Sequence, residues 1–250
     1  MIGPARIVAG LRRRERMRRL RGDSVQCPCC QLSFARFGDD WNRPDAICPR
    51  CGSHERHRLL RLWLERRGAL NGRVLHFAPE YCLTRWLQAR PGLDYVTTDF
   101  PGRGADLRLD MTAIDLPDAS FDVIIASHVL EHVADDRAAL AELARILRPG
   151  GRAIVMVPVD HARPDTYEDT AIATPAAREQ AYRQHDHLRL YGADVAARLS
   201  VPGLAFTAEA YAAELGPRLR ERHRLLEDDE IYVGRRPPAA SSPAPAHGSP

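Results

Sequence analysis

Short apolar runs alternate with helical segments along most of the chain, and this alternation constrains the fold more than any other feature. Apolar spacing predicts helices over 81–89, 135–147, 193–199 and 211–226. Strands that are separated by helices form a parallel sheet covered on both faces, so we predict an α/β fold. The expected strands are residues 74–78, 95–98, 105–109, 121–126, 153–157, 204–208 and 231–233.

Acidic residues follow two neighbouring strands of this expected sheet. Asp99 ends the run 95–98, and Asp110 ends the run 105–109. Ligands of open α/β sheets bind at the carboxyl ends of the strands. The sequence therefore predicts a nucleotide-like cofactor over Ala78, Asp99 and Asp110.

Four of the six cysteines form two CxxC pairs separated by seventeen residues. Each CxxC turn directs two thiolates at one metal ion, and two such turns complete a tetrahedral site with four sulfur ligands. We predict a zinc ribbon over 23–57 whose closed site makes the zinc structural. Two disulfides are the alternative, which the lack of an export signal disfavours. The expected ligands are Cys27, Cys30, Cys48 and Cys51.

Three nearby residues leave some ambiguity about this zinc site. Cys29 is a spare thiol, and His54 and His57 are alternative ligands. The polar stretch 53–58 favours the start of a helix for both histidines. Cys82 stands alone and is expected to be a small buried residue.

The charged residues are unusual because all 36 basic residues are arginine. A chain without lysine cannot form a pyridoxal Schiff base or a Walker-A phosphate loop. Eight of these arginines lie within residues 1–21, so the remainder of a chain with a net charge of +3 is mildly acidic. We expect a basic helix or a disordered arm over 1–22. No run approaches the ~18 apolar residues of a membrane span, and we expect a cytoplasmic protein.

Three stretches resemble the class I S-adenosylmethionine (SAM)-dependent methyltransferases, specifically the methyltransferase type 11 branch. The resemblance covers about residues 70–160. It implies a Rossmann-like fold with a mostly parallel seven-stranded sheet, a methyltransferase domain over 58–236 and SAM as cofactor. The stretches are Ser120-Phe-Asp-Val-Ile124, Val129-Leu-Glu-His-Val133 and Glu142-Leu-Ala-Arg-Ile-Leu-Arg-Pro-Gly-Gly151.

The resemblance also implies roles for individual residues. Asp99 would accept hydrogen bonds from the ribose hydroxyls, and Asp110 and the Met111 amide would contact adenine. Ser127 and His128 would line the methionine end of SAM. One departure stands out, because the family's glycine-rich loop is replaced by the sequence His76-Phe77-Ala78-Pro79-Glu80. We expect this segment to form a different tight turn, with Glu80 binding the ammonium group of SAM; weak or lost cofactor binding is the alternative.

A general base would assist methyl transfer to a hydroxyl or amine. His128 is the best-placed candidate, and His187 is a second candidate from the polar insertion 159–192. The tail 237–250 is rich in proline, alanine and serine and is expected to be disordered.

Three functions are compatible with these features. The first is methylation of a small-molecule or glycan acceptor at oxygen or nitrogen. The second is methylation of ribosomal or transfer RNA, with the zinc ribbon and basic arm binding the RNA. The third is a non-catalytic protein whose altered loop has abolished turnover. The oligomeric state is left open.

Overall fold

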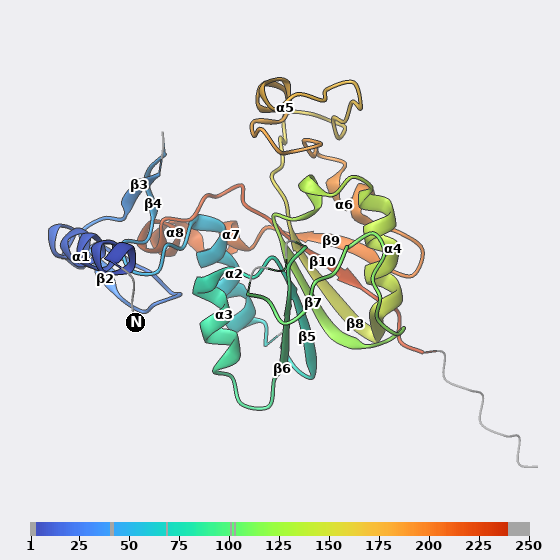
Figure 1. Cartoon of the computed structure of the whole chain (residues 1–250), viewed down its shortest axis with the longest axis horizontal. Helices are drawn as coiled ribbons and strands as arrows, with labels where there is room; N and C mark the ends of the chain where they lie inside the picture. Colours follow the sequence, from blue (N-terminus) through green and yellow to red (C-terminus); the bar gives the residue numbers. More distant parts are fainter. Residues whose placement is uncertain (1–3, 41–42, 69, 101, 103, 240–250) are drawn as a thin grey trace, which may run out of the picture.

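The computed structural model describes residues 4–40, 43–68, 70–100, 102 and 104–239. An N-terminal module lies to one side of a larger α/β domain, and the insertion lies beyond one end of its sheet (Figure 1). Residues 240–250, most of the expected disordered tail, lie outside the described residues. Within the described part of the chain, no helix combines the length and apolar character that crossing a membrane requires.

The central sheet is mostly parallel, as predicted. β5 pairs in parallel with β6 and β7, β7 pairs in parallel with β8, and only β10 runs against both of its neighbours. The strand order is β6-β5-β7-β8-β10-β9. The strands are β5 (Arg73–Phe77), β6 (Asp94–Thr98), β7 (Phe121–Ser127), β8 (Leu147–Met156), β9 (Ala205–Glu209) and β10 (Ile231–Arg235).

The expectation of seven strands is wrong for the described residues, where the sheet has six. The segment expected as a strand over 105–109 makes a single bridge, from Thr98 to Leu107. The carboxylate of Asp106 accepts hydrogen bonds from the amide and hydroxyl of Thr97. The side chain of Asp106 thus accepts from the amide of Thr97, a donor of β6 that a neighbouring strand over 105–109 would have used.

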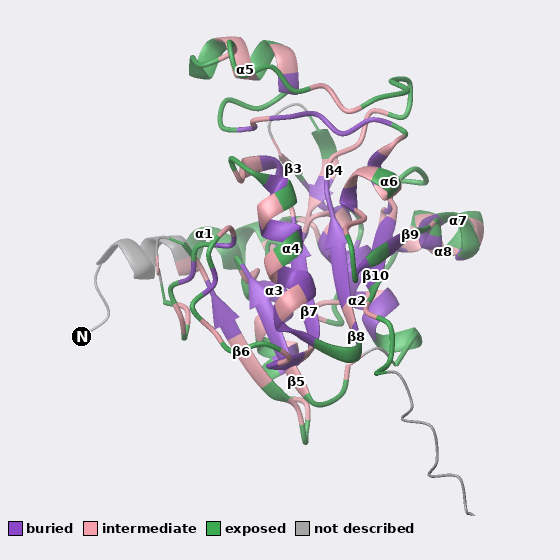
Figure 2. Cartoon of the chain, turned by 90° about the vertical axis from the view of Figure 1, so that its right-hand side faces the viewer, coloured by how far each residue is buried: buried purple, intermediate pink, exposed green. Residues whose placement is uncertain are grey.

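Helices cover both faces of the sheet, and alternate residues of each strand contact opposite layers. In β7, Ile124 and Ala126 face one layer, whereas Val123 and Ile125 face the other. Figure 2 shows the central strands buried between these layers. The first layer contains α4 (Asp136–Ile146) and α6 (Val195–Leu199), and the second contains α2 (Glu55–Arg66), α3 (Tyr81–Gln88) and α7 (Tyr211–Glu214).

The N-terminal module begins with helix α1 (Pro4–Arg19), so this part of the arginine-rich arm is helical. Two short hairpins follow around a small core that includes Phe34 and Phe37. Because both rings are buried, they offer no stacking surface for nucleic acid. The hairpin strands are β1 (Val25–Gln26), β2 (Ser33–Phe34), β3 (Gly38–Asp40) and β4 (Arg43–Ile47).

The helix expected over 211–226 is interrupted. Gly216 has a φ of +74°, a left-handed conformation that ends α7 and begins α8 (Gly216–His223). The insertion contains one short helix, α5 (Pro175–Tyr182). The insertion begins shortly after β8 ends, so it lies beyond the carboxyl ends of the parallel strands (Figure 1).

Candidate active site

A cavity of about 420 Å³ lies at the carboxyl ends of β5, β6 and β7. This volume is within the range of small-molecule sites. Six of the ten residues predicted to bind the cofactor line it: Phe77, Ala78, Asp99, Asp110, Met111 and His128. The other lining residues are Thr98, Phe100, Leu109, Thr112, Val129, His132, Val133 and Ala134.

Two residues that line the cavity adopt left-handed backbone conformations. Ala78 has a φ of +45° and His128 a φ of +54°, although neither is glycine. Each follows a central strand directly, and such conformations cost residues with a Cβ about 1–2 kcal/mol. The expected tight turn after β5 is thus formed by Ala78, without a glycine. This turn places Ala78 at the cavity wall.

Asp99, which follows β6, and Asp110, which follows the bridged segment 105–109, both lie on the cavity wall. Asp110 is exposed, and its Oδ1 accepts hydrogen bonds from the amide and hydroxyl of Thr112 at 2.9 and 2.7 Å. These bonds lower the pKa of Asp110, so the carboxylate is ionised at neutral pH. Asp99 is half-buried and also faces the cavity. The wall therefore presents two separate carboxylates to a ligand.

His76 and Glu80 are placed differently from the sequence-based expectation, since neither is among the described residues that line the cavity. His76 points to the face of β5 opposite Phe77, because side chains alternate along a strand. Glu80 turns toward it, with Oε2 3.1 Å from Nε2 of His76 and Oε1 3.5 Å from Nε2 of His57. Burial alone would raise the pKa of Glu80, but the two histidines lower it to about 2. The carboxylate is thus engaged inside the fold.

The remaining cofactor candidates also lie outside the cavity lining among the described residues. Pro79 follows Ala78 in the turn, and Ser127 is the last residue of β7. The Oγ of Ser127 and the Oγ1 of Thr98 are buried and have no hydrogen-bond partner among the described residues. Unpaired buried hydroxyls at the strand ends are free to bind a polar ligand.

The two predicted catalytic histidines belong to one cluster around Glu131. Nδ1 of His128 lies 3.1 Å from Oε1 of Glu131, and His128 is partly exposed to the cavity. His187, from the insertion, is buried and contacts the ring of His132 edge-on, with centroids 4.8 Å apart. The described lining residues include His132 but not His187. His187 therefore contacts His132 without lining the cavity itself.

A buried polar network that sequence reasoning missed connects the insertion to the cavity wall. Arg189, which is fully buried, donates to the carbonyl oxygens of Leu130, Val133 and Ala134 and to Glu168. These carbonyls belong to the segment after β7 that lines the cavity. The signal available in the sequence was an arginine between two leucines, Leu188 and Leu190, in the otherwise polar insertion.

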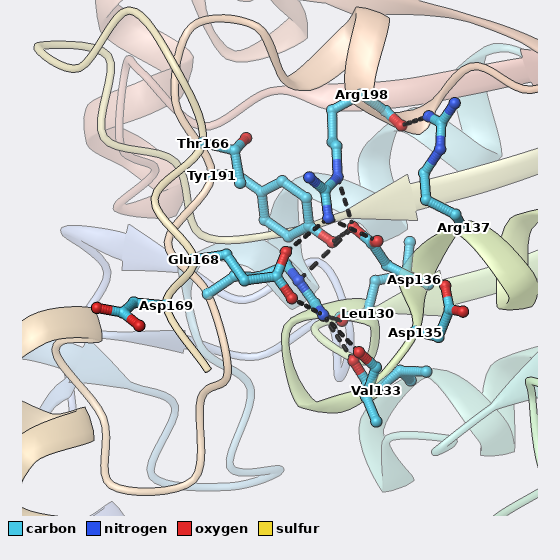
Figure 3. A network of polar contacts seen from close by, with 12 residues as sticks. Leu130, Val133, Asp135, Asp136, Arg137, Thr166, Glu168, Asp169, Tyr191 and Arg198 are labelled. Carbon is cyan, nitrogen blue, oxygen red and sulfur yellow. Dashed lines mark hydrogen bonds and ion pairs between the residues drawn. The ribbon is translucent and has the colours of Figure 1, made fainter. Parts of the chain in front are cut away.

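Asp136 completes this network. Figure 3 shows Arg198 pointing toward two carboxylates, those of Glu168 and the buried Asp136, and it donates to both. Asp136 also accepts a hydrogen bond from Tyr191. Burial raises the pKa of Asp136, but Arg198 and Arg189 reverse that effect and lower it overall. The network thus consists of ionised groups that neutralise one another.

The four cysteines of the CxxC pairs converge in the N-terminal module. All four Sγ atoms lie within 4.8 Å of one another. Sγ of Cys27 is 3.6 Å from that of Cys51, and Sγ of Cys30 is 3.7 Å from that of Cys48. A disulfide requires about 2.0 Å, whereas a zinc tetrahedron with bonds of about 2.3 Å separates its sulfurs by about 3.8 Å. The spacing fits the metal and not the disulfide alternative.

Comparison with known families gives one domain match. Residues 84–155 match the family model described as a methyltransferase domain. This stretch runs from α3 to β8 and includes Asp99, Asp110 and His128. The turn at Ala78, the cysteine module and the insertion lie outside it.

Individual relatives also match only part of the chain. An O-methyltransferase (cnsE) of Penicillium expansum is 49% identical over 57 residues, 22% of this chain and 21% of that protein. A demethylmenaquinone methyltransferase of Renibacterium salmoninarum is 35% identical over 107 residues, 38% of this chain and 45% of that protein. The match spans less than half of each relative.

Among solved structures, the YcgJ protein of Bacillus subtilis aligns with a TM-score of 0.48 and 15% identity. The alignment covers 74% of this chain and 100% of that one. The domain match and the sequence relatives thus show likeness to methyltransferases over the middle of the chain.

Proposed function

We propose that this protein transfers a methyl group from SAM to a small-molecule or glycan acceptor. One observation carries the proposal: Asp99, Asp110 and His128, which follow different segments of the matched region, line one cavity at the carboxyl ends of the strands. SAM would supply an electrophilic methyl group when bound there. The relatives named as an O-methyltransferase and a demethylmenaquinone methyltransferase favour a small acceptor.

The cavity residues divide naturally between cofactor and acceptor. Asp99 suits the vicinal hydroxyls of a ribose, since an ionised carboxylate offers two acceptor oxygens. Asp110 and the amide of Met111 suit adenine. His128 would face the acceptor and take its proton, because it lies beside Glu131 and reaches the cavity. Glu80 is not assigned to the ammonium group of SAM.

Calorimetry with SAM tests the cofactor assignment. The wild-type protein should bind SAM, and Asp99→Asn should weaken binding at least about tenfold, because hydrogen bonds to charged groups contribute about 1.5–3 kcal/mol. Asp94→Asn is the matched control, since Asp94 is an exposed acid at the opposite end of β6. No heat of binding at millimolar SAM would overturn the proposal and favour a non-catalytic protein.

Tritium transfer from labelled SAM into fractionated cell extract then tests the acceptor. We expect label in the small-molecule or glycan fraction. Label found only in the RNA fraction would reject this acceptor class while retaining the methyltransferase activity.

One surface favours RNA as a second candidate acceptor. A second cavity of about 340 Å³ beside the cysteine cluster is lined by Arg13, Arg50, Arg85, Tyr81 and Trp86, among others. Tyr81 is 64% exposed. Arginines bind phosphates and aromatic rings stack on bases, so this combination suits a single strand.

Fluorescence anisotropy with a labelled RNA oligonucleotide tests this surface. The double variant Arg13→Gln, Arg85→Gln should weaken binding and reduce its salt dependence. The control is the double variant Arg12→Gln, Arg14→Gln. It changes two exposed arginines of α1 that flank Arg13 and are not among the residues lining this cavity. Equal losses in both variants would contradict a specific role for the cavity.

A further inference from the structure

Glu131 is the least explained polar residue near the active site. Its side chain is fully buried, and neither carboxylate oxygen has a hydrogen-bond partner of good geometry among the described residues. His128 approaches one oxygen at 3.1 Å. Burial would raise its pKa, but His128 lowers it overall, so the group remains ionised. A buried carboxylate with unused lone pairs is costly unless a cation or donor binds it.

Two histidines place ligand atoms beside this carboxylate. Each of Glu131, His132 and His187 offers one ligand atom within 4.8 Å of the other two. His132 follows Glu131 in the chain, whereas His187 is contributed by the insertion. The backbone reinforces this meeting, because the amide of Leu188 donates to the carbonyl oxygen of Glu131 at 2.8 Å.

The environment of each histidine leaves the same nitrogen available. Nδ1 of His187 lies 3.3 Å from the carbonyl oxygen of Tyr182, and Nδ1 of His132 lies 3.3 Å from that of Asp186. A carbonyl oxygen only accepts, so Nδ1 of each ring carries the proton and Nε2 keeps its lone pair. This is the usual arrangement of metal-binding histidines, whose second nitrogen donates to a carbonyl or carboxylate.

We propose that Glu131, His132 and His187 bind one divalent first-row transition-metal ion beside the active-site cavity. Two imidazoles and one carboxylate suit such ions, and three protein ligands leave coordination positions open. Because His132 lines the cavity, an open position is accessible from it. Given the proposed methyltransferase function, the ion would bind a hydroxyl oxygen of the acceptor, orient it and lower its pKa. The acceptor class is then a compound with a metal-binding hydroxyl group.

Cobalt binding tests the site without any methyl-transfer assay. Protein carrying one equivalent of zinc, which four thiolates bind in preference to cobalt, is titrated with Co²⁺ by calorimetry and visible absorption. We expect one Co²⁺ per chain. Glu131→Gln and His187→Ala should each weaken its binding at least about tenfold, since loss even of a residue that orients a ligand costs 10–100-fold. His185→Ala is the matched control, because His185 is exposed and two residues from His187.

The possible results separate this proposal from the proposed function. Absence of a Co²⁺ site, or a site that Glu131→Gln and His187→Ala leave unchanged, would overturn the metal site. Near-ultraviolet circular dichroism of each variant distinguishes a lost ligand from a lost fold. Co²⁺ binding without SAM binding would contradict the proposed function alone, whereas SAM binding without Co²⁺ binding would contradict the metal site alone.

Discussion

The cysteine module and the α/β domain are organised by different forces. In the module, the described core contains few apolar side chains besides cysteines, including Val25, Phe34 and Phe37. The α/β domain has two extensive apolar layers, one on each face of its sheet. A core as small as that of the module rarely supplies enough stability by itself. We therefore expect the module to depend on the proposed zinc and on its larger neighbour.

Arg58 forms much of that connection. It is fully buried in α2 and donates to the carbonyl oxygens of Ala46 and Ser53 in the module and of His223 and Arg224 at the end of α8. It also lies over the ring of Phe37, 4.4 Å from its centroid. The guanidinium group of Arg58 thus joins the two regions by donating hydrogen bonds to carbonyl oxygens of both.

Loss of the proposed zinc should produce the largest difference between the two regions. Cys48→Ser should abolish hydrogen-exchange protection in the hairpins of the module and leave protection in β5 and β7, because structural zinc contributes much of the folding energy of small modules. Cys29→Ser is the control, since Cys29 lies outside the four-sulfur group. Full protection of the hairpins in Cys48→Ser would contradict a metal-dependent module.

Within the α/β domain, Arg189→Leu should have the next largest effect. It removes one of the two arginines that neutralise the buried carboxylate of Asp136 and takes the Arg189 donor from three carbonyls, so we expect a loss of about 3 kcal/mol in the free energy of unfolding. Urea denaturation measures it. Arg137→Leu, an exposed neighbour, should change stability by less than about 1 kcal/mol. Equal effects would show that the network is not critical.

His57, where the two regions meet, should make stability depend on pH. Burial lowers the pKa of His57 to about 3, from an ordinary value near 6.5. Below pH 6.5 the unfolded chain binds a proton that the folded chain excludes, so this contribution is complete above pH 6.5 and is lost on acidification. Between pH 7 and pH 5 the loss is about 2 kcal/mol.

Urea denaturation of wild type and His57→Gln at both pH values isolates that contribution, because other histidines are common to both proteins. The wild type should lose more stability than the variant on acidification. Parallel losses would show that His57 titrates normally in the folded protein.

The smallest effect is expected at the turn after β5. Ala78→Gly should raise the free energy of unfolding by about 0.5 kcal/mol, because relief of the left-handed strain exceeds the added entropy of the unfolded chain. Ala119→Gly is the matched control, since Ala119 has a φ of +51° away from the cavity. Both should be stabilised equally, and only Ala78→Gly should alter SAM affinity. A destabilised Ala78→Gly would show that the Cβ of Ala78 makes essential contacts.

Much of the fold followed from local patterns. The apolar runs located the strands of the sheet to within two residues, except that β8 begins at Leu147, six residues before the expected start. The run 105–109 forms no full strand, because the side chain of Asp106 competes with ladder formation. Gly216 ended a helix that apolar spacing alone would continue. The exceptions at Asp106 and Gly216 arise where a single residue overrides the average preference of its segment.

The sequence by itself determined the α/β alternation, the paired cysteines and the acidic residue Asp99 at the end of β6, because strand periodicity and CxxC turns are short-range properties. Only the tertiary structure decided that Glu80 faces His76 and His57, that Arg189 supports the segment after β7, and that His187 meets Glu131. Most of these contacts join residues that are far apart in the chain, and the contact between Glu80 and His76 depends on the turn that connects β5 to α3. Their partners are set by how the layers and the insertion pack, which no local pattern records.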